Sequence, residues 1–362
     1  MTLFHMSVQA GEDAGKGALP SRAKEAVSVA RRGDLKSALL LAQQAWQAAR
    51  ELKDERAVLE ATHAASIVHM IRGDSISAVA AATDAFDLAR RLGDASLEGH
   101  ARVSLCFSGA ELGTHEDAER DLGRCIEQAV AAHDSGLEIR ARVALGIVLG
   151  DRGRFELAPA QFQRALALAE DHPGFTPPGC IAVNLANVHR KCAALHVAAG
   201  RQAQAEIHIA EALRVSDQAF RLSLEEEAVP ACVEALGIRA CALEMLGARD
   251  KALALLAYAV SIGVETRSRT AVLWVLCELG RVRVLASELD AARAAYTQAL
   301  DAASGLRPCA TIHIACAGLA DVEGKLGRDA AAADWRARAD SEKAEFERWR
   351  RDSRWQLARL LS

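Results

Sequence analysis

Glycines recur along this chain at a fixed spacing, and this repeat limits the possible folds more than any other feature. The first four lie 40 residues apart, two more follow at steps of 47, and two further steps of 40 reach a serine and a last glycine. The aligned positions are Gly33, Gly73, Gly113, Gly153, Gly200, Gly247, Ser287 and Gly327. A period of this length is typical of proteins that stack one small helical unit many times.

Small residues form columns in the same alignment. Five residues after every aligned position the chain has alanine: Ala38, Ala78, Ala118, Ala158, Ala205, Ala252, Ala292 and Ala332. Twelve residues after it come Ala45, Ala85, Cys125, Ala165, Ala212, Ala259, Ala299 and Ala339. Seven residues before it come Ala26, Ser66, Cys106, Gly146, Ala193, Ala240, Gly280 and Ala320. We interpret the glycine as the end of one helix, and the small residues as points where a second, antiparallel helix packs closely.

Composition and side-chain size agree with paired helices. Hydrophobic residues make up 51% of the chain but aromatics only 4%, and alanine, the strongest helix former, supplies much of the difference. Thirteen residues after the turn a larger side chain fills the space between neighbouring pairs in seven of eight repeats, whereas the last repeat has Asp340. Two irregular places, at 171–179 and 225–230, contain prolines, and we expect a possible bend near 171–180. Pro159 predicts a kinked or late-starting helix.

Four stretches carry a resemblance to a known repeat family. RGDLKSALLLAQQAW (32–46), LGTHEDAERDLGRCI (112–126), RGRFELAPAQFQRAL (152–166) and LGARDKALALLAYAV (246–260) resemble tetratricopeptide repeats, with a glycine turn followed by two spaced small residues. The usual unit is about 34 residues, so steps of 40 resemble the long-repeat type of bacterial sensor and regulatory arrays. The resemblance covers about residues 20–340 and implies an all-α, right-handed solenoid of eight helix-turn-helix repeats. Residues 1–19 are expected to be flexible, and 341–362 to extend the last helix as a cap or coiled-coil contact.

The resemblance also implies a binding groove, lined by the first helix of each repeat. Carried over position by position, the groove residues are His63, Met70, His100, Phe107, Glu111, Arg140, Asp151, Asn187, Arg190, Glu234, Glu244, Trp274, Arg281, Asp321 and Lys325. So many polar residues on one side of a packed helix indicate an exposed face. Arg140, Asn187 and Arg190 could hold a peptide carboxylate through charge-assisted hydrogen bonds. The alternative is that these side chains are only solvated, and the convex face remains an alternative binding surface.

Two other motifs suggest chemistry but have a structural explanation. His189, Cys192 and His196 share one helical face and could present ligands to zinc, yet their offsets from the turn are interior positions, so we interpret them as core. RGD occurs at 32–34 and 72–74. Both copies fall on the repeat turn, where glycine ends one helix and aspartate can cap the next. We therefore predict no metal and no cofactor.

Bulk properties narrow the function further. The net charge of −4 indicates no global attraction to nucleic acid. The nine cysteines include no CxxC pair, no apolar stretch reaches ~18 residues, and residues 1–20 do not resemble a secretory signal. We expect a cytoplasmic protein without a membrane span. The three tryptophans and several arginines after residue 334 predict a long C-terminal helix, which could cap the array, mediate a homodimer or touch an anionic surface.

No phosphate-binding loop, nucleophile elbow or zinc-hydrolase motif occurs, so an enzyme is not predicted. We predict a non-enzymatic scaffold or adaptor that binds a protein or peptide segment in the groove, in bacterial signalling or regulation. The alternatives are a peptide-sensing regulator, or a sensor module that works with a separate output protein such as a diguanylate cyclase. Residues 1–20 do not hold a DNA-binding helix-turn-helix, which argues against direct DNA binding.

Overall fold

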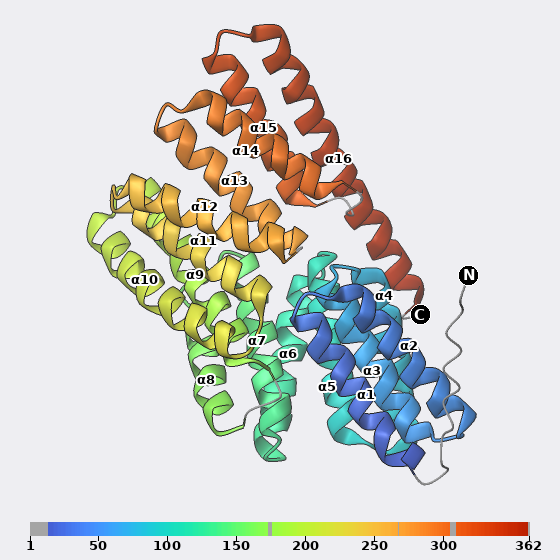
Figure 1. Cartoon of the computed structure of the whole chain (residues 1–362). Coiled ribbons are helices and arrows are strands. Elements are labelled where there is room, and N and C mark those ends of the chain that lie inside the picture. The colour runs from blue at the N-terminus through green and yellow to red at the C-terminus, as the bar shows by residue number, and fades with distance from the viewer. Residues whose placement is uncertain (1–13, 173–175, 267, 305–308, 361–362) are drawn as a thin grey trace. The chain divides into compact units, whose positions relative to one another are not determined.

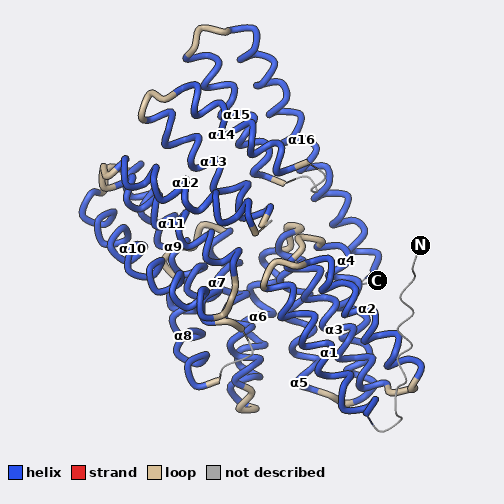
Figure 2. Tube along the Cα trace, viewed as in Figure 1, coloured by secondary structure: helices blue, strands red, loops and turns tan. Residues whose placement is uncertain are grey.

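The computed structural model describes residues 14–172, 176–266, 268–304 and 309–360, and these residues are helical with short connections (Figure 1, Figure 2). Sixteen helices and no strand occur among them. The helices are α1 Ala14–Arg31, α2 Leu35–Glu51, α3 Glu55–Ile71, α4 Ser75–Leu92, α5 Ala95–Glu111, α6 His115–Ala131, α7 Ser135–Asp151, α8 Ala158–Asp171, α9 Pro178–Ala198, α10 Gln202–Glu225, α11 Val229–Met245, α12 Arg249–Glu265, α13 Arg269–Leu285, α14 Leu289–Ala303, α15 Ala310–Lys325 and α16 Asp329–Leu360. They follow one another as eight antiparallel pairs, which confirms the predicted all-α, tetratricopeptide-like repeat fold.

The aligned turn positions share one backbone conformation. All seven aligned glycines have positive φ, from 68° at Gly200 to 106° at Gly113, and Ser287 in the eighth turn has φ 62°. Because glycine adopts this conformation without steric cost, the recurring glycine follows from the turn itself. In both RGD copies the aspartate caps the following helix: Asp34 accepts from the Ser37 amide at 3.0 Å and Asp74 from the Ser77 amide at 3.2 Å. The structural interpretation of these motifs is confirmed.

The two columns of small residues after the turn form the contact between paired helices. All sixteen side chains in these columns are at most 7% exposed. A methyl group or a thiol at these depths allows the helix axes to come close together, so that larger side chains on either side can interdigitate. The alanine content predicted from the alignment is therefore a packing requirement of the repeat.

A complementary pattern links the column seven residues before the turn to the position nine residues after it. Where the first is glycine, the second is aromatic: Gly146 faces Phe162, and Gly280 faces Tyr296. A Cβ on Gly146 would lie 2.7 Å from the Phe162 ring, and one on Gly280 would lie 2.7 Å from the Tyr296 ring. In the sixth repeat the same two positions hold Ala240 and Leu256, both buried. In these three repeats a smaller residue before the turn is thus combined with a larger one after it, so that the two side chains fill a similar total volume.

The chain divides into two compact units, Met1–Leu105 and Cys106–Ser362, within α5. Residues 14–19, part of the stretch expected to be flexible, begin α1, and residues 1–13 lie outside the described part. The expected bend at 171–180 falls inside the second unit. There the two longer repeat steps lengthen α9 to 21 residues and α10 to 24 residues. The chain passes from α10 to α11 through a short turn at Glu227, which has φ 55°.

Two proline positions and the C-terminal helix agree with the sequence. Helix α8 starts at Ala158, with Pro159 in its first turn, so this helix starts late and is not kinked. Helix α9 starts at Pro178, and the Gly179 amide donates to Glu226 Oε1 at 2.9 Å, so that a carboxylate at the end of α10 satisfies the beginning of α9. Helix α16 spans 32 residues and packs along α15.

Candidate functional site

In the second unit the first helices of successive repeats lie side by side. Helix α9 packs against α11, α11 against α13, and α13 against α15, in addition to the contacts within each pair. The predicted groove residues on these four helices therefore belong to one surface built from first helices. We call the part formed by α9, α11 and α13 the helix-A face.

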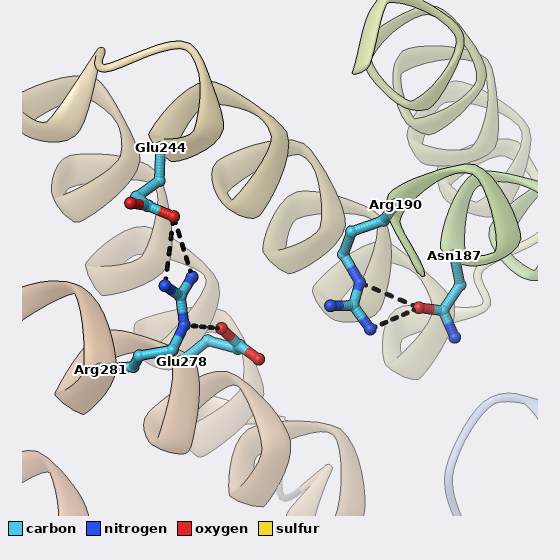
Figure 3. A network of polar contacts seen from close by, with 5 residues as sticks. All are labelled: Asn187, Arg190, Glu244, Glu278 and Arg281. Carbon is cyan, nitrogen blue, oxygen red and sulfur yellow. Dashed lines mark hydrogen bonds and ion pairs between the residues drawn. The ribbon is translucent and has the colours of Figure 1, made fainter. Parts of the chain in front are cut away.

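Two groups of polar side chains lie on the helix-A face (Figure 3). In the first, Arg281 of α13 donates through Nε to Glu278 Oε2 at 2.8 Å and through Nη1 and Nη2 to Glu244 Oε2 of α11 at 3.2 Å. Burial alone would lower the pKa of Arg281, but the nearby carboxylates raise it above its usual value. This group is an ion-pair network of one guanidinium and two carboxylates that ties α11 to α13.

The second group is centred on Arg190 of α9. Its Nε and Nη2 donate to Asn187 Oδ1 at 3.0 and 2.9 Å (Figure 3). Its guanidinium carbon lies 5.5 Å from the centre of the Trp274 ring. Among the described residues no carboxylate lies within 4.0 Å of this guanidinium. An amide oxygen and an aromatic face orient the cation without neutralising it, which leaves Arg190 able to bind an anionic group.

Trp274 connects three helices of this face. It extends from α13 to α11, where a Cβ on Gly237 would come within 2.5 Å of ring atom Cζ3, and its ring also lies beneath Arg190 of α9. Only glycine at position 237 leaves room for the indole. The half-buried ring thus offers an apolar surface next to the free guanidinium, which is a combination common at peptide-binding sites.

Cys241 and Glu234 are the remaining chemical groups of α11 on this face. Burial raises the pKa of the Cys241 thiol to about 12, with a further contribution from Glu278 and opposing ones from Arg190 and Arg281. The thiol is therefore protonated and unreactive at neutral pH. Glu234 is partly buried, and burial raises the pKa of its carboxyl group to about 7. Among the described residues, Glu234 has no hydrogen-bond or ion-pair partner.

The structure thus brings together five of the predicted residues, Asn187, Arg190, Glu244, Trp274 and Arg281, and places Glu234 on the same face. It adds Glu278 and Gly237, which the groove positions do not include. Glu278 stands three residues before Arg281, and an i,i+3 pair of opposite charge on a helix is a signal that the sequence does contain.

The other predicted groove residues lie outside the helix-A face. In the first unit the rings of His63 and His100 are 5.8 Å apart, and Met70 is partly buried. In the second unit Phe107 and Arg140 are partly buried, Glu111 is exposed, and Asp151 pairs with Lys191 at 3.5 Å. Asp321 and Lys325 are exposed and pair with each other on α15.

His189 belongs to a histidine cluster between α9 and α10 that the sequence only partly indicated. Its Nδ1 lies 3.1 Å from His208 Nδ1, and the His196 ring stacks on His208 at 5.3 Å. Burial, with a smaller contribution from His208, lowers the pKa of His189 to about 4. His189 and Cys192 are buried, as expected for core positions. In the described ranges no group of three or more histidine, cysteine or acidic side chains is arranged to hold a metal ion.

A depression over α6, the second helix of its repeat, is a weaker candidate for a binding site. It is shallow and is lined by Glu116, Glu119, Arg120, Gly123, Arg124, Glu127, Arg152 and Arg154. Arg152 and Arg154 already pair with Glu119, at 2.8 and 2.5 Å. Exposed pairs of this kind are mutually neutralised and contribute little. Separately, none of the helices in the described part combines the length and the apolar character needed to cross a bilayer.

Comparison with solved structures places this geometry in a known fold. A Rap protein complexed with Competence and Sporulation Factor matches with a TM-score of 0.60 and 13% identity, over 95% of this chain and 99% of that chain. The Rap conjugation gene regulator of the plasmid pLS20, in complex with the Phr* peptide, matches at 0.57 and 13%, over 91% and 96%. The apo form of the quorum sensor NprR from B. thuringiensis matches at 0.58 and 11%, over 91% and 97%.

These likenesses show the fold alone, because the identities are low. No protein-family model matches the chain, and no curated protein sequence matches it. The fold is tetratricopeptide-like and resembles that of peptide-sensing regulators.

Proposed function

We propose that this chain is a non-enzymatic regulatory module that binds a peptide or a protein segment on the helix-A face of its second unit. The observation that carries the proposal is Arg190, which Asn187 and Trp274 hold in one orientation while no carboxylate of the described residues pairs with it. An oriented cation beside an aromatic surface recognises a carboxylate next to an apolar side chain, and a peptide supplies both.

Two further observations support this proposal. Two of the similar structures are complexes with a Phr* peptide and with Competence and Sporulation Factor, and a third is a quorum sensor. The nucleophilic groups on the helix-A face are unsuited to catalysis, because the Cys241 thiol is held protonated. These observations favour a peptide-responsive regulator over a passive scaffold.

Selection from a random hexapeptide library, displayed with free amino termini, tests the proposal. The bait proteins are the wild type, Arg190→Ala and the matched control Arg249→Ala, since Arg249 is exposed on α12 and makes no ion pair among the described residues. We expect the wild type and the control to enrich one peptide family that contains an acidic residue or depends on its carboxyl terminus. Arg190→Ala should bind those peptides about ten- to a hundredfold more weakly.

The thermal unfolding of each variant is measured in parallel, so that loss of binding is separated from loss of fold. Enrichment of the same peptides with equal affinity by Arg190→Ala would show that the helix-A face is not the binding surface. Failure of the correctly folded wild type to enrich any peptide would contradict the proposed function as a whole.

A further inference from the structure

Glu234 differs from the other carboxylates of the helix-A face. Glu244 and Glu278 both bind Arg281, whereas Glu234 has no hydrogen-bond or ion-pair partner among the described residues. It is nevertheless partly withdrawn from solvent, and burial is the sole cause that raises the pKa of its carboxyl group to about 7. Among the described residues, no arginine or lysine nitrogen lies within 4.0 Å of its carboxylate oxygens, so neither Arg190 nor Arg281 forms an ion pair with it.

The position of Glu234 places it in line with the groups that orient Arg190. Glu234, Gly237, Cys241 and Glu244 follow one another at spacings of three or four residues on α11, and therefore form one stripe along that helix. Trp274 packs on Gly237, one helical turn after Glu234. Among the described residues, the same stripe thus runs from an unpaired carboxyl group, past an indole ring, to the carboxylate of Glu244 that binds Arg281.

The fold itself gains nothing from this arrangement. A carboxyl group that is withdrawn from water without a partner destabilises the folded state once it ionises, and glutamine would have the same size without this effect. Groups whose pKa is shifted by burial at an accessible surface are concentrated at binding and catalytic sites. A carboxylate of this kind is suited to a positive charge that arrives with a ligand.

We propose that Glu234 binds a cationic group of the peptide, either its free amino terminus or a lysine or arginine side chain, while Arg190 binds an anionic one. This inference rests on the proposed function and specifies its ligand: a peptide with opposite charges on either side of an apolar residue that contacts Trp274. Binding is coupled to proton release, because the partly protonated Glu234 must ionise to pair with the cation. Affinity therefore rises with pH between about 5.5 and 7.

The test uses the same displayed hexapeptide library with the wild type, Glu234→Gln and the control Glu265→Gln. Glu265 is exposed on α12 of the same repeat and makes no ion pair among the described residues. We expect the wild type and the control to enrich peptides with a basic residue, or a required free amine, at one fixed position. Glu234→Gln should lose this requirement while it keeps the preference for an acidic group.

The most enriched peptide is then synthesised in its free form and in a form whose cationic group is neutralised. Neutralisation should weaken binding to the wild type about ten- to a hundredfold and leave binding to Glu234→Gln almost unchanged. The wild type should also bind the free form more tightly as the pH rises, whereas the variant should not.

The outcomes separate the two proposals. Peptides that depend on Arg190 but have no required cation, and that bind Glu234→Gln as well as the wild type, would overturn the role of Glu234 and leave the proposed function standing. A wild type that enriches no peptide would overturn both. If the peptides enriched by Glu234→Gln still contain the basic residue, another carboxylate binds the cation and the role of Glu234 is wrong.

Discussion

Replacing Gly146 by alanine tests whether the glycine–aromatic pairs fix the packing of this array. Gly146 lies on α7 and faces Phe162 of α8, which is fully buried. The new methyl carbon would stand 2.7 Å from ring atoms Cε2 and Cζ and 2.9 Å from Cε1. Carbon atoms in contact are normally about 3.5–4.0 Å apart. The ring or the helix must therefore move by roughly 1 Å in a close-packed interior.

Two opposing effects set the magnitude. Alanine is favoured over glycine inside a helix by about 1 kcal/mol, whereas forcing an extra methyl group into a full core destabilises by about 1–3 kcal/mol. Because the ring meets the methyl group face on and is enclosed, we expect the larger cost, with a net destabilisation of about 1–2 kcal/mol. The matched control is Gly123→Ala on α6, where a Cβ would meet nothing within 4 Å. This variant should be more stable than the wild type by about 0.5–1 kcal/mol.

Urea denaturation followed by far-UV circular dichroism measures both variants, and the double variant Gly146→Ala/Phe162→Leu completes a cycle. The sixth repeat already combines alanine and leucine at these two positions, as Ala240 and Leu256. The alanine should therefore destabilise the Phe162→Leu background by much less, with a coupling of about 1 kcal/mol or more. Equal midpoint shifts of the same sign for Gly146→Ala and Gly123→Ala would refute the reasoning.

Three further predictions concern charged groups. Burial raises the folded-state pKa of Glu234 to about 7, so this carboxyl group contributes most to stability below pH 4.5, and its contribution is lost as the pH rises to 7. Glu234→Gln should therefore stabilise the protein relative to the wild type increasingly over this range, by about 1–3 kcal/mol at pH 8. Burial lowers the folded-state pKa of His189 to about 4, so its contribution to stability is complete above pH 6.5 and is lost as the pH falls, by up to about 3 kcal/mol. His189→Gln should flatten that part of the curve of unfolding free energy against pH. An unchanged curve would contradict the assignment. Arg281→Ala leaves two carboxylates unpaired and should lower the free energy of unfolding, measured by urea denaturation at neutral pH, by about 1 kcal/mol or more, whereas Arg249→Ala should not.

The repeat alignment was enough to predict the fold because turn geometry and close packing each require particular residue types. A positive φ selects glycine, and Ser287 shows that the alignment identifies the turn even where the residue differs. The pairing of Gly146 with Phe162 was missed, although both residues stand in aligned columns. A single sequence column shows that a position is small, but only the packed helices show which larger residue fills the remaining space.

The candidate site was predictable in outline and not in its charge balance. The groove positions include Asn187, Arg190 and Trp274, and the structure shows that Arg190 contacts the other two side chains. The groove positions gave no means of distinguishing Arg190, which pairs with no carboxylate among the described residues, from Arg281, which two carboxylates bind. That distinction depends on the length and direction of side chains from neighbouring helices. His208 was missed for the same reason, since its contact with His189 crosses from α10 to α9.

The charge distribution on the helix-A face is the strongest reason to regard it as a binding surface. Arg190 and Glu234 have opposite charges and stand on adjacent helices, and an array selected only for stability would gain by pairing them or by replacing both with apolar residues. The chain instead orients Arg190 against an amide and an indole, and keeps Glu234 apart from it. Elsewhere on the same face Arg281 shows that the helices are close enough to form a complete ion-pair network. Among the described residues, Arg190 and Glu234 have no oppositely charged partner although Arg281 beside them binds two carboxylates, and this arrangement fits a surface whose charged partners come from a ligand.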